Sequence, residues 1–457
     1  MAQFLLPLSL LGKTIPHGYM PLESYATISL LILCIGMLFN KRNVRLSMTE
    51  FKYICLFSIL LLVTQIITVF VSKIVQPQYS GSSISSSMKN SIMLIAVYVL
   101  FYVIITFMIQ SHDDIQRFFD GIEIAMWILL IVCLAQLIYI KFGIGKELVN
   151  FVANLFEERG GTAISTWYAQ GSYAVTTGRI NGLKQETGFL AAQLLIVFIP
   201  YLLTRLKRSY SCERKKIEYK IWIPLILIII ILFQSGSTTA MLGLPIVLFL
   251  TIIIVVKSWK KVFAVVGGTI LVLIISMIFS KSFSSTITRV VFDKFTFSNT
   301  SFAQRMGSAV TMMKIFVKSF GLGVGYNNGG HWSYILAPNF MRYNPEFNSY
   351  WPLSGDGFFA VLSVVTGWLA QFGIIFFGTV TYGIYRILKI TGTWLESIRD
   401  NTIGWMYVWY LRFFVGFTVF TILMSFDWMH PLYIVVFLSM VRIFNVLAQN
   451  DLLEDKI

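Results

Sequence analysis

The sequence predicts an all-α, polytopic membrane protein that forms a single domain over residues 1–457. Hydrophobic residues make up 56% of the chain and charged residues only 12%, whereas about a quarter of a soluble globular chain is charged. Long apolar runs recur along the chain, and basic residues gather in short loops between them. Because a chain in lipid must satisfy its own backbone hydrogen bonds, spans this long and continuously apolar are expected to be helices.

The apolar runs give the number of expected spans. A helix needs about 20 residues to cross ~30 Å of hydrocarbon. Residues 4–12 form a shorter run interrupted by proline, so we expect eleven or twelve transmembrane helices. The eleven longer runs are 22–40, 52–73, 91–110, 118–141, 188–204, 221–234, 239–256, 262–280, 357–385, 405–424 and 431–449.

Basic loops predict the orientation of these spans. The most basic segments between spans are 41–45, 205–220, 257–261 and 386–399. Lys and Arg are enriched in cytoplasmic loops, and placing all four segments inside gives one alternating path. Two long loops, 142–187 and 281–356, then lie outside, and the C-terminus is cytoplasmic, as is the N-terminus if residues 4–12 cross. We therefore attribute the net charge of +15 to basic loops that fix the orientation of the spans, and no nucleic-acid partner is expected.

Several chemistries are not expected. Three of the four cysteines fall within apolar spans and Cys212 lies in a basic loop, so neither a disulfide framework nor metal-ligand spacing is visible. The glycine-rich segment 321–325 follows no strand and precedes no Lys-Ser/Thr pair, which argues against a nucleotide loop. We interpret it as a flexible turn, and we expect neither a metal nor a cofactor.

The outer loop 281–356 is basic although it lies on the face where positive charge is normally scarce. It holds seven basic residues and, before its terminal Asp356, two acidic ones, which favours an anionic ligand. Within 305–320, apolar residues recur with a helical period while Lys314 and Lys318 lie off that stripe. This pattern predicts an amphipathic helix on the outer membrane face.

Three side chains in the outer loops are candidate bases. Asp356 lies where the outer loop meets a span, where it can accept a proton from a sugar hydroxyl or serve as a helix N-cap. His331 titrates near neutral pH, although a loop histidine beside Trp332 is more often structural. Glu186 lies in loop 142–187 close to the membrane surface, together with Arg179 and Lys184.

Four segments, in this order and with this sidedness, resemble the O-antigen polymerase and O-antigen ligase superfamily. They are Arg179-Ile-Asn-Gly-Leu-Lys-Gln-Glu186-Thr-Gly-Phe-Leu-Ala-Ala; Gln234-Ser-Gly-Ser-Thr238-Thr-Ala-Met-Leu-Gly243; Gln304-Arg305, followed by a helix and Gly321-Leu-Gly-Val-Gly325; and Asp356-Gly-Phe-Phe-Ala-Val-Leu362. The chain departs from the family at three positions, one of which is Gly357, where the family has asparagine. Thr238 stands where many members have arginine, and Asp356 stands where ligases have histidine, which favours a polymerase.

The resemblance implies a GT-C-like glycosyltransferase of a bacterial inner (plasma) membrane, active on the periplasmic face without a nucleotide or an essential metal. It would polymerise undecaprenyl-diphosphate-linked oligosaccharide repeats into O-antigen or a related surface polysaccharide. Its partners would be the lipid-linked oligosaccharide, membrane lipid and a polysaccharide chain-length regulator. The implied diphosphate-binding residues are Arg179, Arg305, Lys184 and Lys314, and the implied bases are Asp356, then Glu186, then His331.

Two alternatives stay open at this point. An O-antigen ligase, which transfers the glycan to lipid A core, uses the same donor chemistry. A transporter or flippase of lipid-linked sugar is the alternative that is not an enzyme, and it predicts charged residues within the spans rather than at one face.

Overall fold

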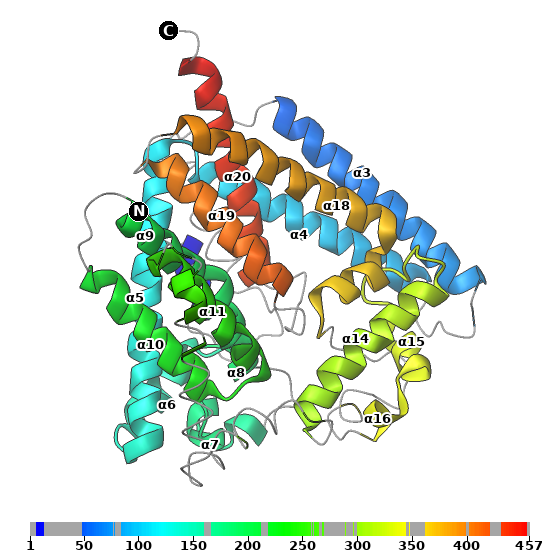
Figure 1. The fold of residues 1–457 in the computed structure, drawn as a ribbon. Helices are drawn as coiled ribbons and strands as arrows, with labels where there is room; N and C mark the ends of the chain where they lie inside the picture. Colours follow the sequence, from blue (N-terminus) through cyan, green and yellow to red (C-terminus); the bar gives the residue numbers. More distant parts are fainter. Residues whose placement is uncertain are drawn as a thin grey trace. The chain divides into compact units, whose positions relative to one another are not determined.

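The fold is given by a computed structural model of the chain (Figure 1). The structure describes residues 6–12, 48–75, 77, 84–159, 166–211, 218–256, 258, 260–264, 267–268, 288, 296, 299–343, 347, 362–398, 402–420 and 431–454. Every regular element among those residues is helical. The predicted all-α class is therefore confirmed for the described part of the chain.

Six of the described helices are long and apolar enough to cross a membrane. They are Glu50–Ile74, Ser87–Met108, His112–Phe142, Thr187–Ser211, Thr238–Val256 and Val364–Leu395. Three shorter apolar helices are Tyr219–Ser235, Ile403–Val419 and Ile434–Gln449. The chain is thus a helical, multi-pass membrane protein. Each of these nine helices overlaps an expected span, whereas span 22–40 and most of span 262–280 lie outside the described residues.

The chain divides into two compact units that alternate along the sequence. Unit 1 comprises residues 1–125, 304–396 and 422–457, and unit 2 comprises residues 126–303 and 397–421. In unit 1, α4 packs against both α3 and α20. The helices of unit 1 are α3 (Met48–Phe70), which continues as a π-helical turn (Val71–Val75), α4 (Ile84–Met108), the first part of α5 (His112–Phe142), most of α14 (Thr300–Lys318), α15 (Gly329–Leu336), α16 (Asn339–Arg342), α18 (Val364–Ser397) and α20 (Pro431–Glu454).

Unit 2 is built around one buried helical segment. Its helices are the rest of α5, α6 (Lys146–Phe156), α7 (Tyr173–Thr177), α8 (Thr187–Gln193), a π-helical turn (Leu194–Phe198), α9 (Ile199–Ser211), α10 (Tyr219–Ser235), α11 (Thr238–Val256) and α19 (Ile403–Phe420). The segment from α8 to α9 contacts α10, α11 and α19, and 89% of its most apolar window is buried. The loop residues that precede α8 are therefore joined directly to the most buried helical segment of the unit.

Pro200 explains why the α8–α9 segment is not a regular α-helix. Proline has no backbone N–H, so it cannot donate to the carbonyl one turn earlier, and its ring crowds that turn. A π-helical turn over Leu194–Phe198 ends two residues before it. The segment thus continues through the proline with a local change of pitch, a known way for a helix to absorb such a defect.

Candidate functional site

Two of the predicted site residues of unit 2 act on the same hydroxyl group. Tyr173 begins α7 and is buried. Burial raises the pKa of Tyr173, the Glu186 carboxylate acts in the same direction, and the Arg179 guanidinium acts in the opposite one. The Thr187 side chain also hydrogen-bonds to it. Arg179 and Glu186 therefore act electrostatically, and in opposite directions, on the same buried tyrosyl hydroxyl.

Arg179 also holds the turn between two membrane helices. Its Nε donates to the carbonyl oxygen of Ser235 at 3.2 Å, and its Nη2 donates to that of Gly236 at 3.0 Å. These carbonyls end α10, where Gly236 has a φ of 61° and forms the left-handed cap. A cation at a helix C-terminus is stabilising because it meets the negative end of the helix dipole. The arginine thus brings positive charge to the start of α11, within segment 234–243.

Glu186 occupies the N-cap position of α8, yet its side chain makes no capping hydrogen bond. The residue is half-buried, and its backbone is extended, with φ −152° and ψ 170°. A carboxylate at this end of a helix is stabilised by the positive end of the dipole. The carboxylate oxygens of Glu186 therefore do not cap α8 by a hydrogen bond.

Lys184 is buried and ion-paired, unlike a lysine that is open to bind a phosphate. Its side chain is 1% exposed, and its Nζ donates to Oε1 of Glu158 at 2.6 Å. The ammonium is therefore neutralised within the loop. Phosphate binding by Lys184 stays a prediction, and it would require Glu158 to give up this contact.

The sequence did not single out Glu157, which is the most deeply buried carboxylate of this loop. Its side chain is 0% exposed, and its Oε1 accepts from Asn181 Nδ2 at 2.9 Å and from the Tyr173 N–H at 3.2 Å. Arg159 Nε lies 3.4 Å from its other oxygen. Burial raises the pKa of Glu157, and these donors offset only part of that effect. Glu157 therefore joins the end of α6 to the start of α7 and to Asn181.

The raised pKa of Glu157 predicts a pH dependence of the outer loop. Below its ordinary value of 4.5 the carboxyl is protonated in both the folded and the unfolded state and adds no pH dependence. As the pH rises from there to the folded pKa, the unfolded state loses its proton first, so the folded loop loses stability. Amide hydrogen exchange of residues 146–187 should therefore show protection falling over this interval in the wild type, and less so in Glu157→Gln. Equal slopes in the two proteins would contradict this assignment.

The helix predicted over 305–320 is present as α14, Thr300–Lys318, and its place on the outer membrane face stays a prediction. Its apolar stripe is exposed, with Met313 at 42% and Val317 at 65%, and Lys314 lies among these exposed side chains. The opposite, buried face is mostly polar and carries Gln304, Arg305, Ser308 and Thr311 with Met312 and Ile315. An exposed apolar stripe beside lysines is the arrangement of a helix that lies in a membrane interface.

Arg305 and Lys314, both predicted diphosphate ligands, thus occupy different faces of α14. Arg305 is 6% exposed, whereas Lys314 is exposed and its Nζ donates to the carbonyl of Leu336 at 3.4 Å. A buried guanidinium is desolvated, so its electrostatic effect on a nearby phosphate is stronger than that of an exposed lysine. Of the two, Arg305 therefore has the environment better suited to acting on a phosphate.

The glycine-rich segment 321–325 is a packed element and not a flexible turn. Helix α18 is broken at Gly373, which has φ 72° and ψ 176°. The N–H groups of Val324 and Gly325 donate to the carbonyls of Ala370 and Gln371 at 2.8 and 3.0 Å, and the Ile374 N–H donates to Gly321 O at 2.8 Å. The loop thereby satisfies the backbone groups that the break exposes, which a membrane interior requires.

Two buried glutamines from membrane helices hold the end of this loop. Oε1 of Gln65, on α3, accepts from the Tyr326 N–H at 2.7 Å, and Oε1 of Gln371, on α18, accepts from the Asn327 N–H at 3.2 Å. Ser87 Oγ on α4 donates to Asn328 Oδ1 at 2.7 Å. Three helices are therefore joined to one loop by buried polar groups, an arrangement that helical periodicity does not reveal.

His331 lies on α15 beside a structural tryptophan. Trp332 is fully buried, and its Nε1 donates to Ser72 Oγ at 3.0 Å. It packs with Met312, Ile315 and Ala370 among others, so α14, α15 and the first half of α18 share a small core. His331 is half-buried at the edge of that core. Its role as a base stays a prediction.

Asp356, the first predicted base, lies outside the described residues. The chain is described again from Leu362, whose N–H donates to Ser308 Oγ at 3.3 Å. Ser308 lies on the same buried face of α14 as Arg305.

Two groups of predicted site residues therefore emerge. Arg179, Glu186 and Lys184 belong to unit 2, whereas Arg305, Lys314 and His331 belong to unit 1. No cluster of His, Cys, Asp or Glu able to hold a metal ion occurs among the described residues. Comparison with protein-family models, curated proteins and solved structures gives no match for this chain.

Proposed function

We propose that this protein is a membrane glycosyltransferase that extends a surface polysaccharide from lipid-linked repeat units. The growing glycan on a polyprenyl diphosphate is the donor, and a second lipid-linked repeat is the acceptor. An acceptor hydroxyl oxygen forms the new bond to the anomeric carbon of the donor. The bond from that carbon to the diphosphate oxygen breaks, the diphosphate leaves with the electron pair, and the hydroxyl proton passes to a base.

The observation that carries this proposal is that Arg179 and Glu186, from the same loop, both act electrostatically on the Tyr173 hydroxyl, Arg179 lowering its pKa and Glu186 raising it. The departing diphosphate gains negative charge, and a guanidinium aimed at it stabilises the transition state. A carboxylate within reach of the acceptor serves as the base. Arg305 is the corresponding cation of unit 1, and Asp356 and His331 are its candidate bases.

The sidedness of these residues also supports the proposal. On the topology with basic loops inside, both groups lie on the outer face, where lipid-linked repeat units are polymerised in the family that the motifs resemble. The exposed apolar stripe of α14 suits a helix that lies at that surface. The GT-C-like fold, eleven or twelve spans, the inner-membrane location and a chain-length regulator as partner belong to the same proposal.

The lipid-linked glycans of a deletion strain test this proposal against ligation. If the protein polymerises, loss of the gene leaves lipid carrying a single repeat, and the plasmid-borne gene restores long chains. Accumulation of long, unligated chains on the lipid would instead identify a ligase. Gel separation of glycans released from the lipid by mild acid distinguishes the two outcomes.

A transporter of lipid-linked sugar is the second candidate, and the break in α18 favours it. Discontinuous helices beside buried polar groups line the substrate sites of many transporters. Gln65, Gln371 and Asn328 are such groups. Movement of lipid-linked sugar across vesicles that contain the purified protein, without growth of the glycan, would favour transport over polymerisation.

A further inference from the structure

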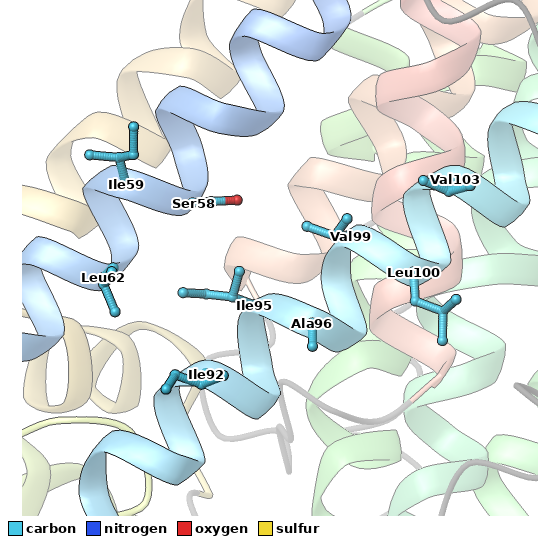
Figure 2. Close-up of a pocket in the computed structure, with 9 residues that line it drawn as sticks. All are labelled: Ser58, Ile59, Leu62, Ile92, Ile95, Ala96, Val99, Leu100 and Val103. Atoms are coloured by element: carbon cyan, nitrogen blue, oxygen red, sulfur yellow. The ribbon is translucent and has the colours of Figure 1, made fainter.

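An open apolar groove runs between two membrane helices of unit 1. It has a volume of about 680 Å³, and Figure 2 shows its walls. Ser58, Ile59 and Leu62 come from α3, and the remaining lining residues are Ile92, Ile95, Ala96, Val99, Leu100 and Val103 of α4. Both helices are membrane spans by length and hydropathy, so the groove opens towards hydrocarbon. A space that side chains leave empty forfeits dispersion contacts, and a lipid chain restores them.

One end of the groove adjoins a hollow that is lined partly by polar side chains. This hollow, of about 440 Å³, shares Ile92 and Ala96 with the groove and extends to Ser85, Met88 and Lys89 at the start of α4. Lys89 and Ser85 are exposed there. An ammonium and a hydroxyl at the positive end of a helix suit a phosphate group. One continuous surface thus offers a hydrocarbon channel followed by a cationic end.

This shape favours a lipid with one long chain. Two helices bound a single channel, which takes one hydrocarbon chain, whereas a phosphoglyceride carries two. The start of α4 also contacts the loop before α15, because the buried Ser87, two residues before Lys89, donates to Asn328, which directly precedes α15. Lys89 itself lies on the exposed face of that turn.

We propose that the α3–α4 groove binds the isoprenoid chain of a polyprenyl diphosphate, with Lys89 beside the diphosphate. This inference rests on the proposed function and adds a binding surface for its lipid. The chain is held by apolar side chains of Ile59, Ile95 and Val99, and the charge of Lys89 fixes which end faces the outer loops.

Photolabelling of the full-length protein in nanodiscs tests this. The probe is a polyprenyl diphosphate with a diazirine on its chain, and labelled peptides are mapped by mass spectrometry. Label is expected in α3 and α4. Ala96→Trp, at an exposed position in the groove, should abolish it, whereas Val63→Trp, exposed on α3 but outside the groove lining, should not. Lys89→Ala should lower labelling about fivefold, the effect of one cation near a lipid surface.

Three results would contradict the proposal that the groove binds a polyprenyl diphosphate. They are labelling unchanged by both Ala96→Trp and Lys89→Ala, labelling confined to other helices, and equal labelling by a diazirine phosphoglyceride. The same nanodiscs are supplied with lipid-linked repeat units to separate this inference from the function. Glycan extension without groove labelling refutes the groove alone, and groove labelling without extension refutes the polymerase while the lipid site stands.

Discussion

Gly373→Ala is expected to destabilise the protein by about 3–6 kcal/mol, since it adds backbone strain to a steric clash. The residue has φ 72° and ψ 176°, a conformation that is almost exclusive to glycine. A Cβ built there would lie 2.1 Å from Leu322 O and 2.4 Å from Leu322 C, which are backbone atoms that cannot swing away. The α18 break and the glycine-rich loop would have to separate.

Gly378→Ala provides the matched control on the same helix. No atom lies within 4 Å of a Cβ placed at Gly378, and alanine favours a helix more than glycine does. Thermal unfolding in detergent, followed by loss of the monodisperse peak on size-exclusion chromatography, measures both variants. Gly373→Ala should lower the midpoint strongly while Gly378→Ala leaves it unchanged or raises it. Equal midpoints would show that the loop does not dock on α18 as described.

Glu50→Ala should cost about 3–5 kcal/mol, because it leaves a buried arginine without its carboxylate. Glu50 and Arg442 are 3% and 2% exposed, and Arg442 Nη1 donates to Glu50 Oε1. The same oxygen accepts from Tyr102 Oη at 2.8 Å and from Asn445 Nδ2 at 3.2 Å. This cluster ties α3, α4 and α20 together within unit 1.

A double-mutant cycle separates the ion pair from the packing of its members. Combining Glu50→Leu with Arg442→Met removes both charges, so the double variant should be more stable than the sum of the single changes predicts. Arg386→Ala, at an exposed arginine whose guanidinium donates to the Tyr382 hydroxyl at 3.4 Å, should change stability by less than about 0.5 kcal/mol. Strict additivity at positions 50 and 442 would contradict a coupled pair.

The elements that were predictable are those with a local signal. Hydropathy located the apolar helices, and the spacing of apolar residues located α14 with Lys314 off its stripe. Arg179 and Glu186 were selected from motif residues, and their common neighbour Tyr173 was noted only as an aromatic residue. These features depend on neighbours a few positions apart along one helix or loop.

The features that were missed depend on distant partners. The loop at 321–325 resembles a flexible turn until α18, about 50 residues later, supplies its hydrogen-bond partners. Gly373 in the middle of an apolar run was the available signal, because an interior glycine often marks a close backbone approach. Burial of Glu157 has no local signature, and Arg442 within an apolar run was a signal for a buried pair.

The most direct test of the central proposal is glycan extension by the purified protein. Lipid-linked repeat units extracted from the deletion strain are the substrate, and a ladder of longer lipid-linked chains is the expected product. Arg305→Ala should slow extension by about 10²–10³-fold, the effect of losing one group that stabilises developing charge. Arg342→Ala, an exposed arginine of the same outer segment, should extend at the wild-type rate. Full-rate extension by Arg305→Ala would remove its role, and no extension by the wild-type protein would contradict the polymerase itself.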